Sequence, residues 1–450
     1  MALTLEELTS KVDDGDIDTV VVADTDMQGR LYGKRLSAKH FLEVGQEGIG
    51  TCSVVLGWGQ NHSLDPGYAF TGWDSGFPDF ISVPDLSTLR ICGWQPRTAI
   101  VLANAQSLEG GAVDFSPRVI LKRQLRRCES ADLFPKFVSE LEFYLLRETP
   151  DTLHEKGYVN ILPRHQVMHP ETVLRSSQDE DFLQALRAAL AISEVPVEMV
   201  KAEYSPGQVE INLRYDDALR AADAHVLLKT AAKELALKQD LVATFMAKVN
   251  HDLGGSSCHI HMSMLDRTGA SAFDDGKGGM SKTLQSFIAG LVRYSRDFFL
   301  FFAPTTNSYK RLVPNTFAPA RICWGHDNRT VSFRIVGKGV AKRVENRLPG
   351  ADINPYLAYS AMLAAGLRGV EEKLDLGAPP MDGNAYTQDA GDPIPGNLNE
   401  ATDALAQSEA VAQAFGEDVR AHYTNFGRQT ANAFKTVVTD AERRVLLLDI

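Results

Sequence analysis

Charged side chains recur two residues apart in several segments that otherwise have the apolar and β-branched composition of strands. Alternate residues of a strand face the same side of a sheet, so both members of each pair would share one face. One such pair alone is more often a solvated strand face or a structural histidine than a site. Three pairs have this spacing: Glu140 and Glu142 in VSELEFY, His259 and His261 in CHIHM, and Glu345 and Arg347 in VENR; a fourth pair, Glu203 and Glu210, lies on either side of a Pro-Gly turn.

Four such pairs in one chain favour a metal-dependent site, because buried charges must be paired or must bind a metal. Five glutamates and one histidine of these pairs, converging with several arginines, would suit two hard divalent cations beside an anionic substrate. His259 would be a neutral imidazole ligand in a set dominated by oxygen. Sites of this composition that also handle phosphates favour Mg²⁺ or Mn²⁺ over Zn²⁺.

Arginines form a second group, since Arg311, Arg329, Arg334 and Arg347 lie in otherwise apolar or strand-like sequence. Arginine is the usual bidentate partner of carboxylate and phosphate groups. Surface salt bridges explain a single arginine well, but they explain the segment NRTVSFR poorly. Strand alternation there would place its two arginines among apolar side chains.

Two regions of different secondary structure must position these residues. Up to about Ala105 the sequence predicts a small, mainly β region, and a polar linker, Gln106–Asp114, follows. Beyond the linker, helices alternate with short charged strands, which implies an α/β or α+β catalytic domain. The predicted elements of the first region are a helix at 4–14, a strand at 18–24, a hairpin around Gly29 at 27–36, and extended runs at 50–58 and 79–86. Those of the second are helices at 116–128, 180–192, 218–247, 284–302 and 355–374, and strands at 136–146, 199–203, 208–214, 257–264 and 330–336.

Composition excludes several other classes of protein. The net charge of −12 argues against nucleic acid or an anionic membrane as a partner. The five cysteines include no CxxC pair, as expected for reduced thiols in a cytoplasm. The N-terminus, MALTLEELTS, lacks the basic flank and apolar run of a signal peptide, and the longest apolar run, 298–304, is too short to span a bilayer. The segment DDGKGG at 274–279 lacks the first glycine of a P-loop. We therefore expect a cytoplasmic protein.

Six longer segments resemble the glutamine synthetase family in its bacterial type I branch: VSELEFYLL, EYSPGQVEINLRY, MAKVNHDLGGSSCHIHMSM, NSYKRLVP, APARICWGHDNRTVSFRI and RVENRLPGADINPYLA. The resemblance is close from about Pro117 to the C-terminus and looser before it. It implies an α+β fold, with an N-terminal β-grasp domain over residues 1–110 and a catalytic domain over residues 111–450. The catalytic domain would be built on a curved antiparallel sheet flanked by helices. The family usually forms a dodecamer of two hexameric rings, with active sites between subunits.

The resemblance also implies ATP and glutamate as substrates, two or more Mg²⁺ or Mn²⁺ ions per subunit, and a role for each site residue. The metal ligands would be Glu142, Glu203 and Glu210 for one ion, and Glu140, His259 and Glu345 for the second, which contacts the nucleotide phosphates. The nucleotide would lie near His261, Ser263 and Arg334. Glutamate would be held by Arg311, Arg347 and the backbone around Gly255, and charge on the transferring phosphoryl group by Arg329 and Arg334. The implied reaction is formation of γ-glutamyl phosphate, followed by attack of an amine.

Two departures from the family pattern concern that amine. The family loop is R-L-V-P-G-x-E-A-P, and its glutamate attracts ammonium and takes its proton; here Arg311 is kept and the glutamate position holds Phe317. The family's D-G-S-S segment, whose aspartate helps to bind ammonium from the neighbouring subunit, is replaced by the apolar CSVVLGWGQ, which ends near Trp58. An ammonium ion without a partnering anion has an uncompensated desolvation cost, whereas an apolar amine substituent gains about 0.8 kcal/mol per buried CH₂.

The sequence therefore predicts a γ-glutamylamide synthetase for an apolar monoamine, such as an arylamine or a small branched alkylamine. A polyamine ranks lower, since its far cation would need carboxylates. The alternatives are a true glutamine synthetase, a γ-glutamylpolyamine or ethanolamide synthetase, and a non-catalytic descendant, against which the presence of all six metal ligands argues. Tyr386, in GNAY, falls near the tyrosine that some members adenylylate, although the surrounding sequence departs from the family's.

Overall fold

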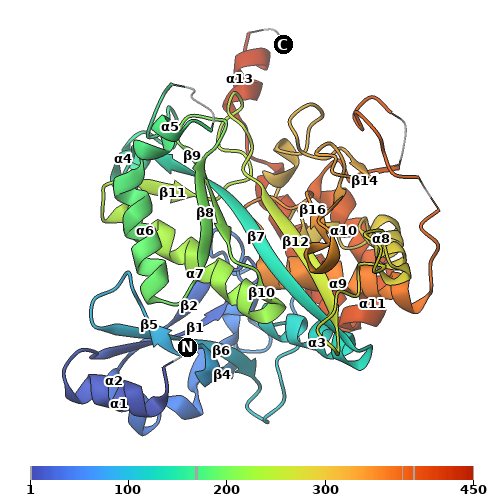
Figure 1. Ribbon diagram of the computed structural model, residues 1–450. Helices are drawn as coiled ribbons and strands as arrows, with labels where there is room; N and C mark the ends of the chain where they lie inside the picture. The colour runs from blue at the N-terminus through green and yellow to red at the C-terminus, as the bar shows by residue number, and fades with distance from the viewer. Residues whose placement is uncertain (1–2, 168–170, 378, 389–390, 449–450) are drawn as a thin grey trace.

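The structure is a computed structural model that describes residues 3–167, 171–377, 379–388 and 391–448. Two sheets organise it: a smaller one from the N-terminal quarter of the chain and a larger one that crosses the middle of the molecule (Figure 1). Helices lie beside both sheets, so the architecture is α+β, as predicted. No helix in the described part of the chain combines the length and apolarity that crossing a membrane would require.

The N-terminal sheet has the strand order β2-β1-β6-β4-β3, with β5 beside β6. Its first two strands form the predicted hairpin around Gly29, whose φ of 76° suits glycine. Helices α1 and α2 cover one face, where Leu8 and Phe41 pack in one cluster with Val20 and Val101. The elements are α1 (Leu5–Asp13), β1 (Thr19–Thr25), β2 (Leu31–Ser37), α2 (Ala38–Glu43), β3 (Ile49–Cys52), β4 (Asp79–Pro84), β5 (Arg90–Ile91) and β6 (Thr98–Gln106).

The large sheet has the order β14-β15-β16-β12-β7-β9-β8, and β10 and β11 also pair with β7. Its described strand pairs are antiparallel except β14 with β15. The strands are β7 (Leu133–Leu146), β8 (Val197–Ala202), β9 (Gln208–Leu213), β10 (Asp216–Asp217), β11 (Val242–Thr244), β12 (Cys258–Asp266), β14 (Trp324–His326), β15 (Phe333–Val336) and β16 (Arg343–Asn346). A separate two-stranded sheet joins β13 (Arg321–Ile322) to β17 (Asp392–Pro393).

Helices bury one face of the large sheet. Phe137 of β7 stacks on Tyr359 of α9, with ring centroids 4.3 Å apart, and the buried Leu141 and Phe143 follow it at strand spacing. The apolar core is continuous from Met27 near the N-terminal sheet into this layer. The domain boundary near residue 110 lies between β6 and α3 and stays a prediction. The helices are α3 (Pro117–Ser130), α4 (Pro150–Glu155), α5 (Val173–Ser177), α6 (Glu180–Ile192), α7 (Ala218–Leu237), α8 (Lys282–Tyr294), α9 (Pro355–Glu371), α10 (Leu398–Gln407), α11 (Glu409–Phe415), α12 (Glu417–Lys435) and α13 (Asp440–Leu446).

Four predicted elements are too long. The helix predicted over 218–247 ends at Leu237, because the chain turns at Asp240 with φ 53° and then enters β11 beside β7. The helix predicted over 284–302 ends at Tyr294, and a 3₁₀ turn covers Phe299–Phe301. The extended run predicted over 50–58 is a strand only at Ile49–Cys52, and the strand predicted over 330–336 begins at Phe333.

Candidate metal and substrate site

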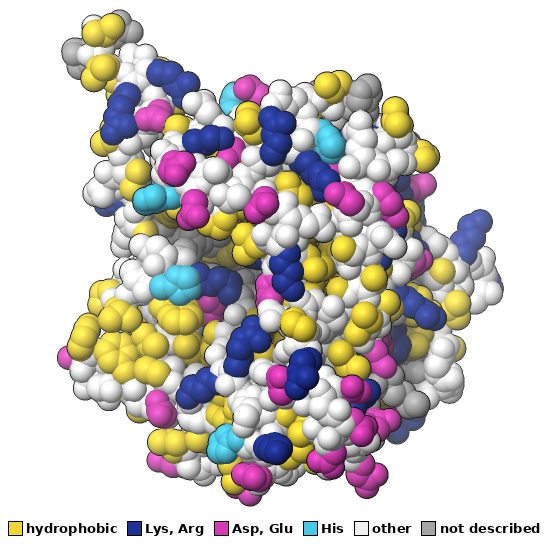
Figure 2. All heavy atoms as spheres, turned by 90° about the vertical axis from the view of Figure 1, so that its left-hand side faces the viewer, with side chains coloured by type: hydrophobic (Ala, Val, Ile, Leu, Met, Phe, Trp, Pro, Cys, Tyr) yellow, Lys and Arg dark blue, Asp and Glu magenta, His cyan; other side chains and the backbone are white. Residues whose placement is uncertain are grey.

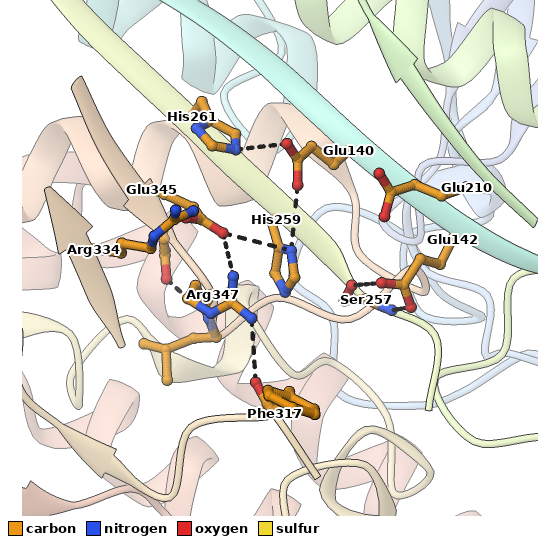
Figure 3. A network of polar contacts seen from close by, with 12 residues as sticks. Glu140, Glu142, Glu210, Ser257, His259, His261, Phe317, Arg334, Glu345 and Arg347 are labelled. Carbon is orange, nitrogen blue, oxygen red and sulfur yellow. Dashed lines mark hydrogen bonds and ion pairs between the residues drawn. The ribbon is translucent and has the colours of Figure 1, made fainter. Parts of the chain in front are cut away.

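The register of five neighbouring strands places the predicted charges on one face of the large sheet. Residues that are directly opposite in an antiparallel pair point to the same face. The opposed pairs are Glu142 with Glu210, Glu140 with His259, His261 with Glu345, and Glu345 with Arg334. This face is opposite to the one that the helices bury, so it stays open to a ligand. Figure 3 shows these side chains pointing toward one another from the strands.

Glu142, Glu203 and Glu210 form the first cluster, with ligand atoms within 4.8 Å of one another. The backbone N–H of Ser257 donates to Glu142 over 2.8 Å. Burial and the neighbouring charge of Glu203 raise the pKa of Glu142. Burial, together with the charges of Glu140 and Glu142, raises the pKa of Glu210 to about 9. Three carboxylates this close are repulsive unless a cation lies among them, so their chemistry fits a divalent metal.

A lysine already lies beside this first cluster. The Lys201 Nζ is 2.5 Å from Glu203 and 3.5 Å from Glu210. Sequence reasoning missed Lys201, although its position two residues before Glu203 was a signal that it could face the same side.

Glu140, His261 and Glu345 form the second cluster, also with ligand atoms within 4.8 Å. His259 Nδ1 lies 3.4 Å from Glu140 and 3.6 Å from Glu345. Burial, with the nearby charge of Arg347, lowers the pKa of His259 to about 4, so its imidazole is neutral at pH 7. Burial alone would raise the pKa of Glu345, but His259 and Arg347 outweigh it and bring that pKa to about 2. A carboxylate that stays ionised beside a neutral imidazole fits a metal ligand set.

The two histidines differ in their hydrogen bonds. Arg343 Nε donates to His261 Nδ1 over 3.1 Å, so a neutral His261 carries its proton on Nε2. That Nε2 faces Glu140 at 2.9 Å, which is an ion-pair distance without the alignment of a hydrogen bond. The groups whose ligand atoms converge are therefore Glu140, His261 and Glu345, whereas the predicted set has His259 in place of His261; His259 lies beside the same two carboxylates. Arg343, two residues before Glu345, is a second residue that sequence reasoning missed.

The four predicted arginines differ in their burial and in their bonding partners. Arg334 Nη1 is 2.8 Å from Glu345, and Arg347 pairs with the same carboxylate. Arg311 is buried and donates to the backbone carbonyls of Leu348 and Arg347, at 2.9 and 3.2 Å, rather than to a carboxylate. Arg329 is exposed in the turn before β15, so the expectation that strand alternation buries it among apolar residues is wrong.

The loop after Arg311 presents Phe317 to solvent. The side chain is 67% exposed, and its backbone has the left-handed φ of 59°. Arg347 Nη2 donates to the Phe317 carbonyl over 3.4 Å, as Figure 3 shows. The Tyr386 hydroxyl donates to the next carbonyl, that of Ala318, over 3.0 Å. The predicted amine position therefore adjoins the arginines of the second cluster.

Of the remaining predicted residues, Ser263, His261 and Gly255 lie at this face of the sheet, and Trp58 does not. Ser263 and His261 line one cavity of about 560 Å³ that also reaches Glu140. The Gly255 carbonyl accepts from Gln208 Nε2, and a side chain at Gly255 would collide with Arg311. Trp58 is not brought to this face of its own chain: its indole N–H donates to Asp26 over 3.1 Å, within the N-terminal region.

This fold carries two clusters of acidic groups that could hold metal ions, beside several arginines, and comparison with known proteins gives its family. The chain matches the family model described as glutamine synthetase, catalytic domain, over residues 114–446, and it therefore belongs to the glutamine synthetase family. The family predicted from the sequence is confirmed.

Three similar proteins cover almost the whole chain. Gamma-glutamylethanolamide synthetase GlnA4 of Streptomyces coelicolor is 43% identical, over 98% of this chain and 95% of its own. The glutamate–isopropylamine ligase of a Pseudomonas species is 38% identical, over 90% of each chain. A solved structure of a GmaS/ADP complex superposes with a TM-score of 0.84 at 29% identity, covering 98% of this chain and 99% of the other.

Proposed function

We propose that this protein is an ATP-dependent ligase that joins the γ-carboxylate of glutamate to an organic amine. The observation that carries the amine specificity is Phe317, which offers neither an anion for ammonium nor a base for its proton. Similar proteins named for ethanolamide, isopropylamine and putrescine products or substrates support this class of reaction.

The proposal includes two Mg²⁺ or Mn²⁺ ions per subunit, and the two acidic clusters of the sheet face support it. Glu142, Glu203 and Glu210 would hold one, and Glu140, His259 and Glu345 the other. Such ions neutralise phosphate charge and orient the phosphates. The cavity with Ser263 and His261 would take the nucleotide, with the Nε2 proton of His261 as a phosphate donor.

The rest of the face supports the transfer itself. Arg311, Arg347 and the backbone at Gly255 would hold glutamate, while Arg334 and the exposed Arg329 would stabilise charge on the transferring phosphoryl group. The amine nitrogen then attacks the γ-carbonyl carbon of γ-glutamyl phosphate. The C–N bond forms, the bond from that carbon to the phosphate oxygen breaks and releases inorganic phosphate, and the neutral amine passes one proton to that phosphate or to water.

Phe317 favours a small apolar monoamine as the nucleophile. Its exposed ring offers apolar contact, and each CH₂ of the amine buried there would contribute about 0.8 kcal/mol. A diamine would need an acidic partner for its far ammonium, and residues 312–319 contain no carboxylate. Ethanolamine is also a candidate, because its far end is a neutral hydroxyl that needs no acidic partner.

We also propose a cytoplasmic homo-oligomer, with Trp58 of a neighbouring copy completing the amine site. The C-terminal helix α13 projects from the body (Figures 1 and 2), and Val445 and Leu446 on it and Leu447 directly after it are exposed. An exposed apolar segment of this kind suits contact with a second copy. The rings predicted from the family, one hexamer or two, remain part of this proposal.

The test is phosphate release from ATP with glutamate and Mg²⁺ across ammonium, isopropylamine, ethanolamine, putrescine and aniline, with the amide product identified by mass. We expect at least one monoamine to exceed ammonium tenfold or more in kcat/KM. The variant Glu142→Gln, which lacks a proposed metal ligand, measures the background rate of phosphate release. If ammonium outruns every organic amine, the protein is a glutamine synthetase and the proposal fails.

A further inference from the structure

Residues 381–386 connect two parts of the site that are distant in the sequence. We call them the bridging segment. At one end, the segment is attached to the turn that carries Arg329: Asn328 Nδ2 donates to the carbonyls of Met381 and Gly383, at 3.2 and 2.8 Å, and Ala385 N donates to Thr330 Oγ1 over 3.0 Å. Met381 and Ala385 pack with Val331 in a small apolar cluster. This end is therefore firmly anchored.

At its other end, the bridging segment reaches the loop of Phe317. The Tyr386 hydroxyl donates to the Ala318 carbonyl over 3.0 Å, and the tyrosine is partly buried there. Burial raises the pKa of Tyr386, so the hydroxyl keeps its proton and remains a donor through neutral pH. The only other side-chain bond recorded to the Phe317 and Ala318 carbonyls, within the described residues, is the 3.4 Å bond from Arg347.

The Phe317 ring depends on such backbone bonds for its position. A phenylalanine with φ near 59° adopts a conformation that costs of order 1 kcal/mol or more and persists only where its surroundings enforce it. Two-thirds of the side chain is exposed, so packing within this chain does little to fix it. Hydrogen bonds hold the loop instead: Thr316 Oγ1 donates to the Val313 carbonyl over 2.6 Å before the ring, and Arg347 and Tyr386 donate to the carbonyls of Phe317 and Ala318.

We infer that Tyr386 is a positioning residue for amine selection, which acts by holding the Phe317 loop through its hydroxyl. The inference rests on the proposed role of Phe317 at the amine site. It adds that selection of the amine is set jointly by Phe317 and by a segment attached to the Arg329 turn. The amine position and the phosphoryl-stabilising arginine are thereby kept at a fixed separation.

The test is Tyr386→Phe, which removes the hydroxyl and keeps the ring. Loss of one such bond predicts a three- to tenfold fall in kcat/KM for the best amine of the panel, through its KM. The ratio of this amine to ammonium should fall by a similar factor. The KM values for glutamate and ATP should stay within twofold, and thermal denaturation confirms folding.

Tyr423→Phe is the matched control. Its hydroxyl also donates to a backbone carbonyl, that of Phe115, over 2.8 Å, but in the buried helical layer. We expect this variant to lose thermal stability and to keep the wild-type ratio of the two nucleophiles. If both tyrosine variants change the ratio equally, general loosening explains the effect and the inference is overturned.

Phe317→Ala separates this inference from the proposed function. If Phe317→Ala leaves the ratio unchanged, the amine site is wrongly placed and both fail. If Phe317→Ala changes the ratio but Tyr386→Phe does not, the proposed function stands and the positioning role is refuted. If both change it, the double variant should match Phe317→Ala alone, because the hydroxyl then has no ring to position. Additive effects would contradict the inference.

Discussion

Replacing Gly255 with alanine should weaken glutamate binding by moving Arg311. A Cβ at Gly255 would lie 2.6 Å from Arg311 Cγ and 3.0 Å from the Ala247 carbonyl oxygen. Ordinary carbon–carbon contact begins near about 3.5 Å, so the arginine must withdraw by roughly 0.9 Å. Arg311 is buried and bonded to two carbonyls, which leaves it little freedom to withdraw without breaking a bond.

The expected magnitude follows from those bonds. A hydrogen bond of a charged group contributes about 1.5–3 kcal/mol, which corresponds to roughly a 10- to 100-fold rise in the KM for glutamate. The assay is steady-state kinetics with varied glutamate at saturating ATP, Mg²⁺ and amine. The KM for ATP should change little, because neither Gly255 nor Arg311 lines the cavity that contains His261 and Ser263.

Gly254→Ala is the control in the same loop. A Cβ there would meet Ser205 Oγ at 3.0 Å and Gln208 Oε1 at 3.4 Å, a milder crowding than at Gly255 and one that does not involve Arg311. We expect less than a threefold change in the KM for glutamate. If Gly255→Ala folds and keeps a KM for glutamate within twofold of wild type, the placement of glutamate at Arg311 is refuted.

Three further predictions concern charge. Lys201→Met should raise Mn²⁺ affinity severalfold by calorimetry and lower the melting temperature of the metal-free protein, because Lys201 partly neutralises Glu203; unchanged affinity would contradict this. Burial raises the pKa of Asp24 to about 7 from an ordinary 3.8. As the pH rises from 4 to 7, Asp24 is therefore ionised in the unfolded chain but still protonated in the folded one, and the free energy of unfolding falls. Asp24→Asn should flatten that slope in denaturant titrations, and an unaltered slope would count against it. Arg118→Ala should cost about 3–5 kcal/mol in the same titrations, since it removes the cation that pairs with the buried Asp223 and leaves it the Tyr356 hydroxyl; a loss below 1 kcal/mol would show that the pair is not needed.

The charged strands were predictable because their signal is local. A period of two fixes which residues share a face, and the paired registers of β7, β12 and β16 then follow from burying Phe137 and Leu141 on the other face. The α+β class and the family were predicted from segments of the same kind. The individual site roles stay predictions, which the variants above test.

Other features depend on tertiary contacts that no local pattern contains. Residues 238–247 continue a helical pattern, yet β11 forms there because β7 offers an edge at Tyr144–Leu146. Arg329 shares its segment with Arg334, but the strand starts after it. The Tyr386–Ala318 bond joins residues 68 positions apart, and only the folded chain shows it.

The most direct test of the central claim is the kcat/KM for ammonium and for the best organic amine, measured in wild type and in Phe317→Glu. A glutamate at this position restores an anion for ammonium and a base for its proton. We predict that the variant gains ammonium activity and loses organic-amine activity, so that the preference shifts by tenfold or more toward ammonium. A wild-type preference for ammonium that Phe317→Glu leaves unchanged would contradict the account.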